Sequence, residues 1–170
     1  KNALLKKDKI NKLKALIIKS KYTTLFALVV SGEMIFSLPF HLTRYFRPTI
    51  LEAFAITNSE LGDAFAIYGL TAMISYFPGG ILADKFSIRH LMSGSLIATS
   101  VGGIYLLYIP NSFELSLLYG YWGITSILFF WAALIKATRQ WGGVFSQGKA
   151  FGYLDGGRGL VAATFATLSV

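Results

Sequence analysis

The chain of 170 residues contains 54% hydrophobic residues against 14% charged residues, which is too apolar for an ordinary soluble surface. Its formal net charge of +8 could indicate a nucleic-acid ligand, but the lysines crowd at the N-terminus, as in a membrane-orientation signal, and we expect no nucleic-acid partner. Without cysteine, and with His41 and His90 as its two histidines, the sequence offers no disulfide and no catalytic zinc cluster. We expect no metal and no cofactor.

Residues 1–21 form a basic segment, which we interpret as a cytoplasmic N-terminal segment. The apolar run that follows is longer than the hydrophobic region of a signal peptide and lacks a convincing small-residue cleavage site. We therefore expect a retained membrane helix. Because the chain starts at Lys1 and stops at Val170 within an apolar run, we also expect it to be a fragment of a longer protein.

Long apolar stretches then alternate with short polar ones, and each stretch approaches the ~20 residues that a helix needs to cross a bilayer. Helices are expected because hydrocarbon offers the backbone no hydrogen-bond partners. The first helix could extend further, since Pro48 can kink a membrane helix without ending it. The predicted spans are approximately Leu25–Tyr45, Leu61–Ala83, Leu91–Ile109, Leu115–Ile135, and Phe151 to the end.

The second and fourth connections carry most of the remaining basic residues, and they lie on the side of the lysine-rich start if every span crosses the membrane. These residues are Lys85, Arg89, Lys136, Arg139 and Lys149. The opposite connections have a much smaller excess of base. The positive-inside bias therefore predicts a cytoplasmic N-terminus in a multi-pass protein of the cell membrane, and the lysine-rich start can also contact anionic lipid.

The strongest motif is the second connection, GGILADKFSIRH at Gly79–His90. It resembles the loop signature of the major facilitator superfamily, which runs Gly, three residues, Asp, a basic residue, any residue, Gly, and two basic positions. Four residues match, namely Gly80, Asp84, Lys85 and Arg89, whereas Ser87 and Ile88 depart from the signature. A generic basic loop on the inner side of a multispanning protein is the alternative interpretation.

Such a loop has a physical purpose at a short cytoplasmic turn. The glycines let two helices approach, Asp84 can cap a helix or pair across the bundle, and the basic residues hold the loop inside. The departures resemble the organophosphate:phosphate antiporter branch, in which the glycine is replaced and a lone arginine follows. The stretch Trp141–Gly152, followed by Gly-Gly-Arg-Gly at 156–159, is also similar to the fourth loop and fifth helix of that branch, although a sugar-acid or other anion transporter could share these features.

The resemblance implies an all-α integral membrane fold in which residues 22–170 form the first five of twelve helices, within the N-terminal six-helix half. It implies a substrate site at the interface with a C-terminal half that this sequence lacks. The partners would then be a small organic anion, the lipid bilayer and the missing half of the same protein. A bacterial inner membrane is the expected location.

Ionisable residues within a span are costly to bury, so each is a functional candidate. At ~100° per residue, Glu33 and Arg44 project from one face of the first predicted helix, with Ser37 and His41 nearby. A guanidinium suits phosphate or carboxylate because its fork makes paired hydrogen bonds. Arg44 is therefore the first candidate for substrate binding, and it falls near the anion-binding arginine of the antiporter branch. The alternative is an arginine that reaches the lipid headgroups, which we expect of Arg47.

The other candidates each have a structural alternative. Glu33 could carry a coupled proton or form a salt bridge with a residue inside or outside this chain, and His41 could relay a proton, contact an anion or simply pack. Asp155 and Arg158 are three residues apart and can pair with each other. In the functional interpretation, Arg158 is a second anion contact.

Two further predictions concern helix faces. In the functional interpretation of Arg158, three glycines let a neighbouring helix approach the last span closely, namely Gly152, Gly156 and Gly159. Tyr68 and Tyr76 share a face of the second predicted helix and could line a cavity, although aromatic residues in membrane proteins more often pack or form interfacial belts.

The sequence predicts a transporter that moves a small organic anion by alternating access, through antiport or proton symport. A transporter-like sensor and a non-transporting remnant stay open as alternatives. We do not expect an enzyme, because neither a Gly-x-Ser-x-Gly elbow nor a phosphate-binding loop is present in the sequence.

Overall fold

The computed structural model describes residues 20–168, which form helices joined by short connections and contain no strand. Most of the predicted basic segment 1–21 lies outside these residues. The described chain opens with the helix Ser20–Met34. The elements after it are η1 (Ser37–His41), α2 (Leu42–Tyr45), α3 (Arg47–Ala53), α4 (Asn58–Lys85), α5 (Ile88–Tyr105), η2 (Leu106–Tyr108), α6 (Ser112–Gly123), η3 (Ile124–Trp131), α7 (Ala132–Gly142) and α8 (Gln147–Leu168).

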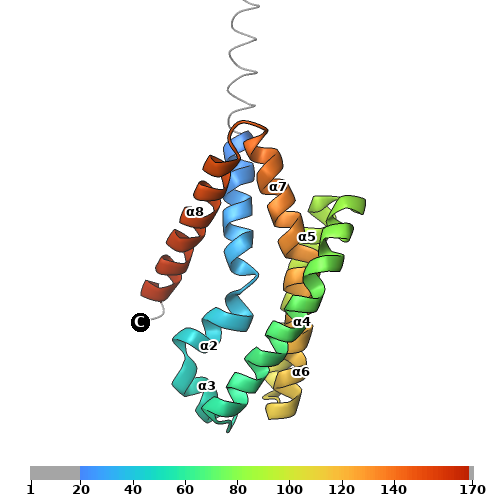
Figure 1. Cartoon of the computed structure of the whole chain (residues 1–170). Helices are drawn as coiled ribbons and strands as arrows, with labels where there is room; N and C mark the ends of the chain where they lie inside the picture. The colour runs from blue at the N-terminus through green and yellow to red at the C-terminus, as the bar shows by residue number, and fades with distance from the viewer. Residues whose placement is uncertain (1–19, 169–170) are drawn as a thin grey trace, which may run out of the picture.

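The long helices alternate in direction along the bundle (Figure 1). The start of the described chain, the α4–α5 connection and the α7–α8 connection lie at one end, and the α3–α4 and α5–α6 connections lie at the other. The predicted alternation of the basic connections is therefore present in the fold. Lys85, Arg89, Arg139 and Lys149 all belong to the end where the described chain begins.

Three stretches are long and apolar enough to cross a membrane, namely Asn58–Lys85, Ile88–Tyr108 and Ser112–Gly142. They coincide with the second, third and fourth predicted spans. A fourth arises if the bent pair Ser20–Met34 and Ser37–Tyr45 counts as one span. The fifth predicted span corresponds to α8, which has 22 residues. It is not among these stretches because its glycines, Asp155 and Arg158 lower its mean hydropathy.

Polar caps explain where the apolar helices begin. Thr57 precedes α4, and its hydroxyl accepts a hydrogen bond from the Glu60 backbone N–H while the Glu60 carboxylate accepts one from the Thr57 N–H. Asn111 and Glu114 form the same reciprocal arrangement before α6. Ser87, where the loop signature would have glycine, caps α5 by accepting from the His90 N–H. Each cap pairs backbone donors that a helix start otherwise leaves unsatisfied.

The first predicted span is not one regular helix, and this corrects the expectation of a continuous helix over residues 25–45. The helix Ser20–Met34 ends, a π-helical turn follows at Ser37–His41, and the two parts are bent by 40°. Pro39 explains the break because it has no N–H to donate to the preceding turn. The Phe36 carbonyl instead accepts from both the Phe40 and the His41 N–H groups. Pro48 lies at the start of the separate helix α3.

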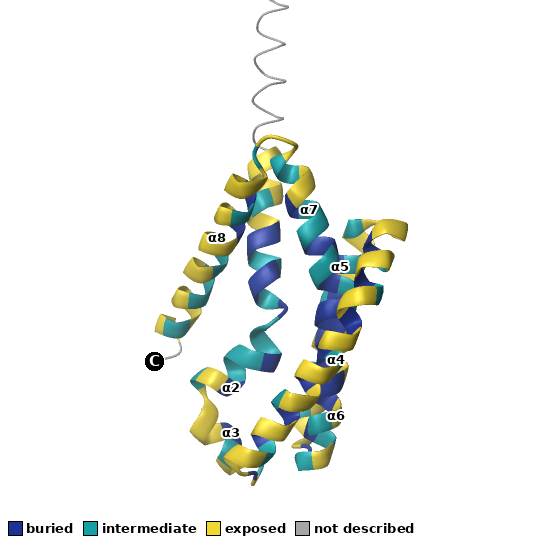
Figure 2. Ribbon diagram, viewed as in Figure 1, coloured by how far each residue is buried: buried dark blue, intermediate teal, exposed yellow. Residues whose placement is uncertain are grey.

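Two apolar clusters hold the helices together. One centres on Leu61, Tyr119 and Trp122, where α4 packs along α6 and η3. The other joins the helix Ser20–Met34 to α5, α7 and α8 around Ile35 and Phe130. Figure 2 shows buried residues along the first helix and in the α4–α6–α7 region, whereas much of α8 is exposed. Among the described helices, α8 packs against α7 and the first helix.

Close helix contacts occur at glycines, but not at the three predicted ones. In the described part of the chain, a Cβ atom at Gly152, Gly156 or Gly159 would meet nothing within 4 Å. The predicted close approach at these three residues is therefore wrong for residues 20–168, because that face of α8 packs against no described helix. The neighbouring Gly157 makes the contact instead, since a Cβ there would lie 2.8 Å from methyl carbons of Val29.

Candidate functional site

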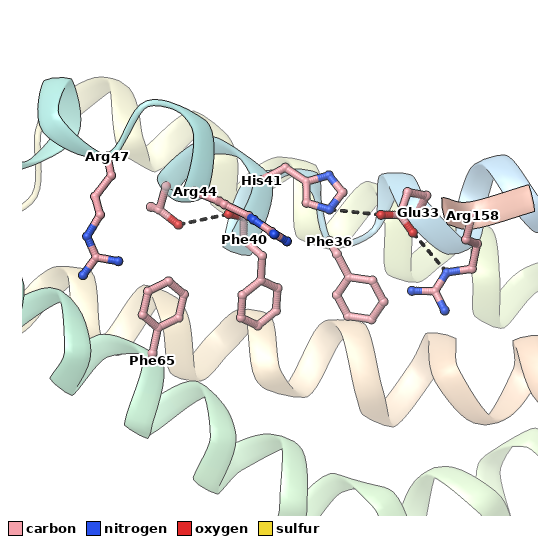
Figure 3. A pocket seen from close by; sticks show the side chains of 9 residues that line it. Glu33, Phe36, Phe40, His41, Arg44, Arg47, Phe65 and Arg158 are labelled. Carbon is pink, nitrogen blue, oxygen red and sulfur yellow. Dashed lines mark hydrogen bonds and ion pairs between the residues drawn. The ribbon is translucent and has the colours of Figure 1, made fainter. Parts of the chain in front are cut away.

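A cavity of about 480 Å³ lies where the first span breaks. The described residues that line it come from the first span, α2, α3, α4 and α8, as Figure 3 shows in close-up. They are Glu33, Phe36, Phe40, His41, Thr43, Arg44, Arg47, Phe65 and Arg158. Four of the six residues that the sequence suggested as substrate contacts, Glu33, His41, Arg44 and Arg158, therefore share one cavity.

Glu33 is the centre of the charged part of this cavity. Its Oε1 atom lies 3.0 Å from His41 Nε2, and its Oε2 atom accepts a hydrogen bond of 3.1 Å from Arg158 Nε. The side chain of Glu33 is 8% exposed and that of Arg158 is 20% exposed. The sequence left open whether the partner of Glu33 lies outside this chain, and the structure provides it on α8. A buried carboxylate with such a partner is much less costly than an unpaired one.

Arg158 has contacts on several sides that fix its orientation. Its guanidinium carbon lies 5.6 Å from the ring centroid of Phe36 and 5.4 Å from that of Trp131, both suitable for cation–π attraction. Its Nη1 atom lies 3.6 Å from Asp155 Oδ1, although the Asp155 side chain is 69% exposed. Because Nε is occupied by Glu33, the outer end of the fork is directed into the cavity, as Figure 3 shows.

His41 is held mainly by its contact with Glu33. Its other ring nitrogen, Nδ1, is buried and has no hydrogen-bond partner within the described chain. The ring lies 5.8 Å from the ring of Tyr45, whose hydroxyl donates to the Ala162 carbonyl on α8. The segment around His41 is thereby tied to α8 at two points, His41–Glu33–Arg158 and Tyr45–Ala162.

Arg44 and Arg47 add positive charge to the other end of the cavity. In the part of the chain that the structure describes, neither forms an ion pair with a carboxylate. Arg47 Nε donates to the neutral Asn58 Oδ1 at 2.8 Å. Arg47 was expected to reach the lipid headgroups, whereas the structure places it on the cavity wall with Arg44. Glu33 can neutralise one of the three lining guanidinium groups, so the described lining keeps an excess of positive charge.

The two candidate tyrosines do not line this cavity. Tyr68 is 7% exposed and packs in the core, where its hydroxyl lies 2.7 Å from Ser126 Oγ. Tyr76 is 55% exposed and lines a separate hollow beside Asp84 and Lys136. Tyr68 supports the cavity wall from behind, because its ring packs edge-on against Phe40 with the ring centroids 4.7 Å apart.

The loop motif spans the C-terminal end of α4 and the start of α5. Asp84 pairs across the bundle with Lys136 of α7 at 3.0 Å, and Lys136 also donates to the Ala83 carbonyl. Pairing across the bundle was one of two roles predicted for Asp84. Of the two glycines, Gly79 rather than Gly80 makes the close approach, since a Cβ at Gly79 would lie 3.0 Å from the Leu128 carbonyl oxygen.

The remaining motif residues are both exposed, Lys85 at the end of α4 and Arg89 at the start of α5. Arg89 borders a groove lined also by Met92 and Trp141. No member of the loop motif lines the cavity at Glu33. The motif and the cavity are therefore separate features of this structure.

Three lining residues that the sequence analysis did not single out are phenylalanines. Phe36 and Phe40 are one helical turn apart in the first span, four residues from each other like the polar positions Ser37 and His41. This four-residue spacing is the sequence feature that could have identified both rings as neighbours of the polar positions. Phe65 on α4 has no such signal, because its place depends on how α4 packs against the first span. Among the described residues, no group of three His, Cys, Asp or Glu could hold a metal ion.

Comparison with known proteins identifies related chains. Residues 24–170 match the family model of the Major Facilitator Superfamily. The chain is 30% identical over 157 residues to the inner membrane protein YihN of Escherichia coli K12, covering 91% of this chain and 37% of that protein. It is 29% identical over 150 residues to the inner membrane protein YqcE of the same organism, covering 88% of this chain and 35% of the relative. The chain thus spans about a third of the length of these curated relatives. No solved structure matches it.

Proposed function

Because the chain belongs to the major facilitator superfamily, we propose that it is part of a secondary transporter that moves a small organic anion across the membrane by alternating access. Membership of the family supports a multi-pass membrane transporter. The proposed substrate class depends on the cavity at Glu33 and on the charges of the residues that line it.

The observation that carries the proposal is the charge balance of the cavity. Three guanidinium groups, those of Arg44, Arg47 and Arg158, face one carboxylate, that of Glu33. Arg44 and Arg47 are exposed, so their charges create a positive potential in the cavity rather than a buried-charge cost. That potential attracts an anionic substrate and repels a cationic one.

The chemistry of the lining also suits an oxyanion. Guanidinium groups bind phosphate or carboxylate through paired, charge-assisted hydrogen bonds. The outer end of the Arg158 fork is directed into the cavity, and its acidic neighbour among residues 20–168 is the exposed Asp155, 3.6 Å from Nη1. Arg44 is exposed with no acidic partner among residues 20–168. The two forks approach the cavity from different helices, α2 and α8, so a single anion would bridge them.

The cavity lies at a broken helix, which is where substrates bind in many transporters. Discontinuous membrane helices expose backbone groups and helix ends toward a binding site near the middle of the bilayer. Here the break at Ser37–His41 places His41 and Arg44 beside the helix that carries Glu33. We propose that the other wall comes from the remainder of a longer protein, in keeping with the length of the relatives.

The finer features of the proposal follow the sequence resemblance. The N-terminus would be cytoplasmic, because the basic connections gather at the end of the bundle where the described chain begins. The organophosphate:phosphate antiporter branch is the nearest in its motifs, and both phosphate exchange and proton symport are compatible with the cavity. The role is that of a transporter rather than an enzyme.

The test is uptake of labelled organic phosphates and sugar acids into vesicles that carry the transporter in its full natural length. The variant is Arg44→Lys, which keeps the charge and removes the fork. Losing paired hydrogen bonds to a charged ligand costs ~1.5–3 kcal/mol, so we expect at least about tenfold lower uptake at low substrate concentration. Arg139→Lys is the matched control, because Arg139 is exposed on α7 outside the cavity.

The outcomes separate the competing interpretations. Saturable anion uptake that collapses in Arg44→Lys but persists in Arg139→Lys supports both the transport function and the role of Arg44. Unchanged uptake in both variants would show that Arg44 does not bind the substrate. If the protein inserts normally but no anion moves, transport fails as an explanation, and a solute-dependent signal without flux would favour a sensor.

A further inference from the structure

The apolar part of the cavity consists of three phenyl rings. Among the nine described residues that line it, Phe36, Phe40 and Phe65 are apolar, and the others are charged or polar. The ring centroids are 6.0 Å apart between Phe36 and Phe40, and 5.6 Å apart between Phe40 and Phe65. Figure 3 shows these rings in one row, with Arg44 and Arg47 beside the row and Arg158 near the Phe36 end.

The row is fixed from behind by the bundle core. Phe40 meets the ring of Tyr68 edge-on at 4.7 Å, and Phe65 meets the ring of Tyr119 edge-on at 5.2 Å. Tyr68 and Tyr119 are 7% and 1% exposed, so they cannot easily move aside. The three phenyl rings themselves are only half-buried. A rigid, partly exposed apolar surface beside a set of cations is suited to a ligand with both an apolar face and an anionic group.

The arrangement of the lining also distinguishes between ligands. The charged groups and the phenyl rings lie side by side along the cavity, from Arg158 and Phe36 at one end to Phe65 and Arg47 at the other. A free inorganic oxyanion takes the space of only a few waters. It would contact the guanidinium groups and leave the three rings wetted, so the rings would contribute nothing to its binding. A six-carbon ring bearing one acid group can reach both surfaces at once.

We propose that the substrate is a cyclic organic anion, such as a sugar acid or sugar phosphate in its ring form, whose carbon-bound face packs on Phe40 and Phe65 while its acid group binds Arg158 and Arg44. This inference rests on the proposed transport function and specifies its substrate. The phenyl rings then select ring-shaped anions over open-chain anions of equal charge, because only a closed ring presents a flat face of C–H groups.

The experiment compares two anions that differ in shape but not in charge. D-Glucuronate closes into a six-membered ring, whereas D-gluconate is an open chain, and both carry one carboxylate and six carbons. D-Glucose 6-phosphate and glycerol 3-phosphate provide a second pair of ring and open-chain anions. Uptake is measured in proteoliposomes of the full-length transporter for the wild type, Phe65→Leu, Phe65→Tyr and the control Phe77→Ala. Phe77 lies on the same helix and is 82% exposed, outside the cavity.

Losing the contact between a phenyl ring and the bound anion should weaken binding of that anion about tenfold. In Phe65→Leu we therefore expect the KM for the ring anions to rise about tenfold and the KM for the open-chain anions to change less than about twofold. Phe65→Tyr keeps the ring and should retain the preference, as should Phe77→Ala. Phe40→Leu repeats the test at the neighbouring ring if Phe65→Leu fails to insert.

Two failures are distinguishable. If the wild type transports anions but Phe65→Leu and Phe40→Leu affect ring and open-chain anions equally, the ring inference is overturned and the transport function stands. If the wild type transports none of the four anions, the proposed function is overturned together with this inference.

Discussion

The pair formed by Glu33 and Arg158 offers a quantitative test of the structure, independent of any substrate. The perturbation is a double-mutant cycle with Glu33→Gln, Arg158→Gln and the two combined. Glu33→Gln keeps the size of the side chain and removes its charge, whereas Arg158→Gln replaces the charged guanidinium by a shorter polar amide. The cycle isolates the interaction between the two residues, because effects of each substitution on other neighbours cancel.

The expected magnitude follows from burial. Removing one partner of a buried ion pair costs ~3–5 kcal/mol, and a hydrogen bond to a charged group contributes ~1.5–3 kcal/mol. Arg158 is 20% exposed and keeps Asp155 at 3.6 Å, so we expect Glu33→Gln to cost less than the loss of a fully buried partner and close to the value of a charged hydrogen bond, about 2 kcal/mol. Arg158→Gln leaves the buried carboxylate with His41 alone among its described ionic partners, and it should cost about 3 kcal/mol. The coupling energy should be about 1.5 kcal/mol.

Equilibrium unfolding of the full-length protein in mixed detergent micelles measures these free energies. Asp155→Asn is the matched control, because Asp155 is 69% exposed and an exposed ion pair contributes ~0–1 kcal/mol. A coupling energy below ~0.5 kcal/mol, the usual error of additivity, would mean that Glu33 and Arg158 do not interact as the structure has them.

Two further predictions concern the packing of α4 against α6 and η3. Gly123→Ala should lower the free energy of unfolding by about 1–3 kcal/mol, because the added Cβ would lie 2.6 Å from the Tyr68 carbonyl oxygen; Gly69→Ala, with nothing within 4 Å, should change it little in the same unfolding assay. Ser126→Ala should cost ~1–3 kcal/mol because it leaves the buried Tyr68 hydroxyl without a partner, and most of that loss should disappear when Tyr68→Phe is added; an additive double variant would contradict the hydrogen bond.

The sequence predicted the long spans because their signal is local. Apolar stretches of bilayer length require helices, and the connections between them carry the capping and turn residues. The predicted spans 61–83, 91–109 and 115–135 differ from the corresponding stretches by a few residues at most of their ends. At the starts of α4 and α6, the helix begins earlier than predicted because a capping pair lies in the polar sequence before the apolar stretch. These pairs are Thr57 with Glu60 and Asn111 with Glu114.

The break in the first span was not predicted, although its cause is visible in the sequence. A regular 100° step assigns Glu33, His41 and Arg44 to one helical face, but the π-helical turn at Ser37–His41 changes the step between them. The prediction placed weight on Pro48 and none on Pro39. A proline within a membrane helix is tolerated whenever neighbouring groups satisfy the freed carbonyl, so the sequence alone does not decide which of the two prolines bends the chain.

The sequence could suggest contacts between residues far apart in the chain, but it could not determine which of them form. Arg158 lies 125 residues from Glu33, and it was expected either to pair with Asp155 or to bind substrate. Phe65 was not singled out at all, because nothing in the periodicity of α4 distinguishes a cavity wall from a packed core position. Such placements depend on the angle at which whole helices cross, which is set by many packing contacts together.

The contacts of Arg158 show why its structural and functional interpretations are compatible. Glu33 binds the guanidinium at Nε, which lowers the cost of burying both charges, and the rings of Phe36 and Trp131 hold the plane of the group. Neither contact uses the outer edge of the fork, where the exposed Asp155 lies 3.6 Å from Nη1 and leaves further N–H donors for the cavity. A guanidinium has five N–H donors, so one carboxylate cannot satisfy it. The ion pair that stabilises the fold therefore also prepares the free donors that an anion would bind, and the double-mutant cycle and the uptake assay measure two consequences of the same geometry.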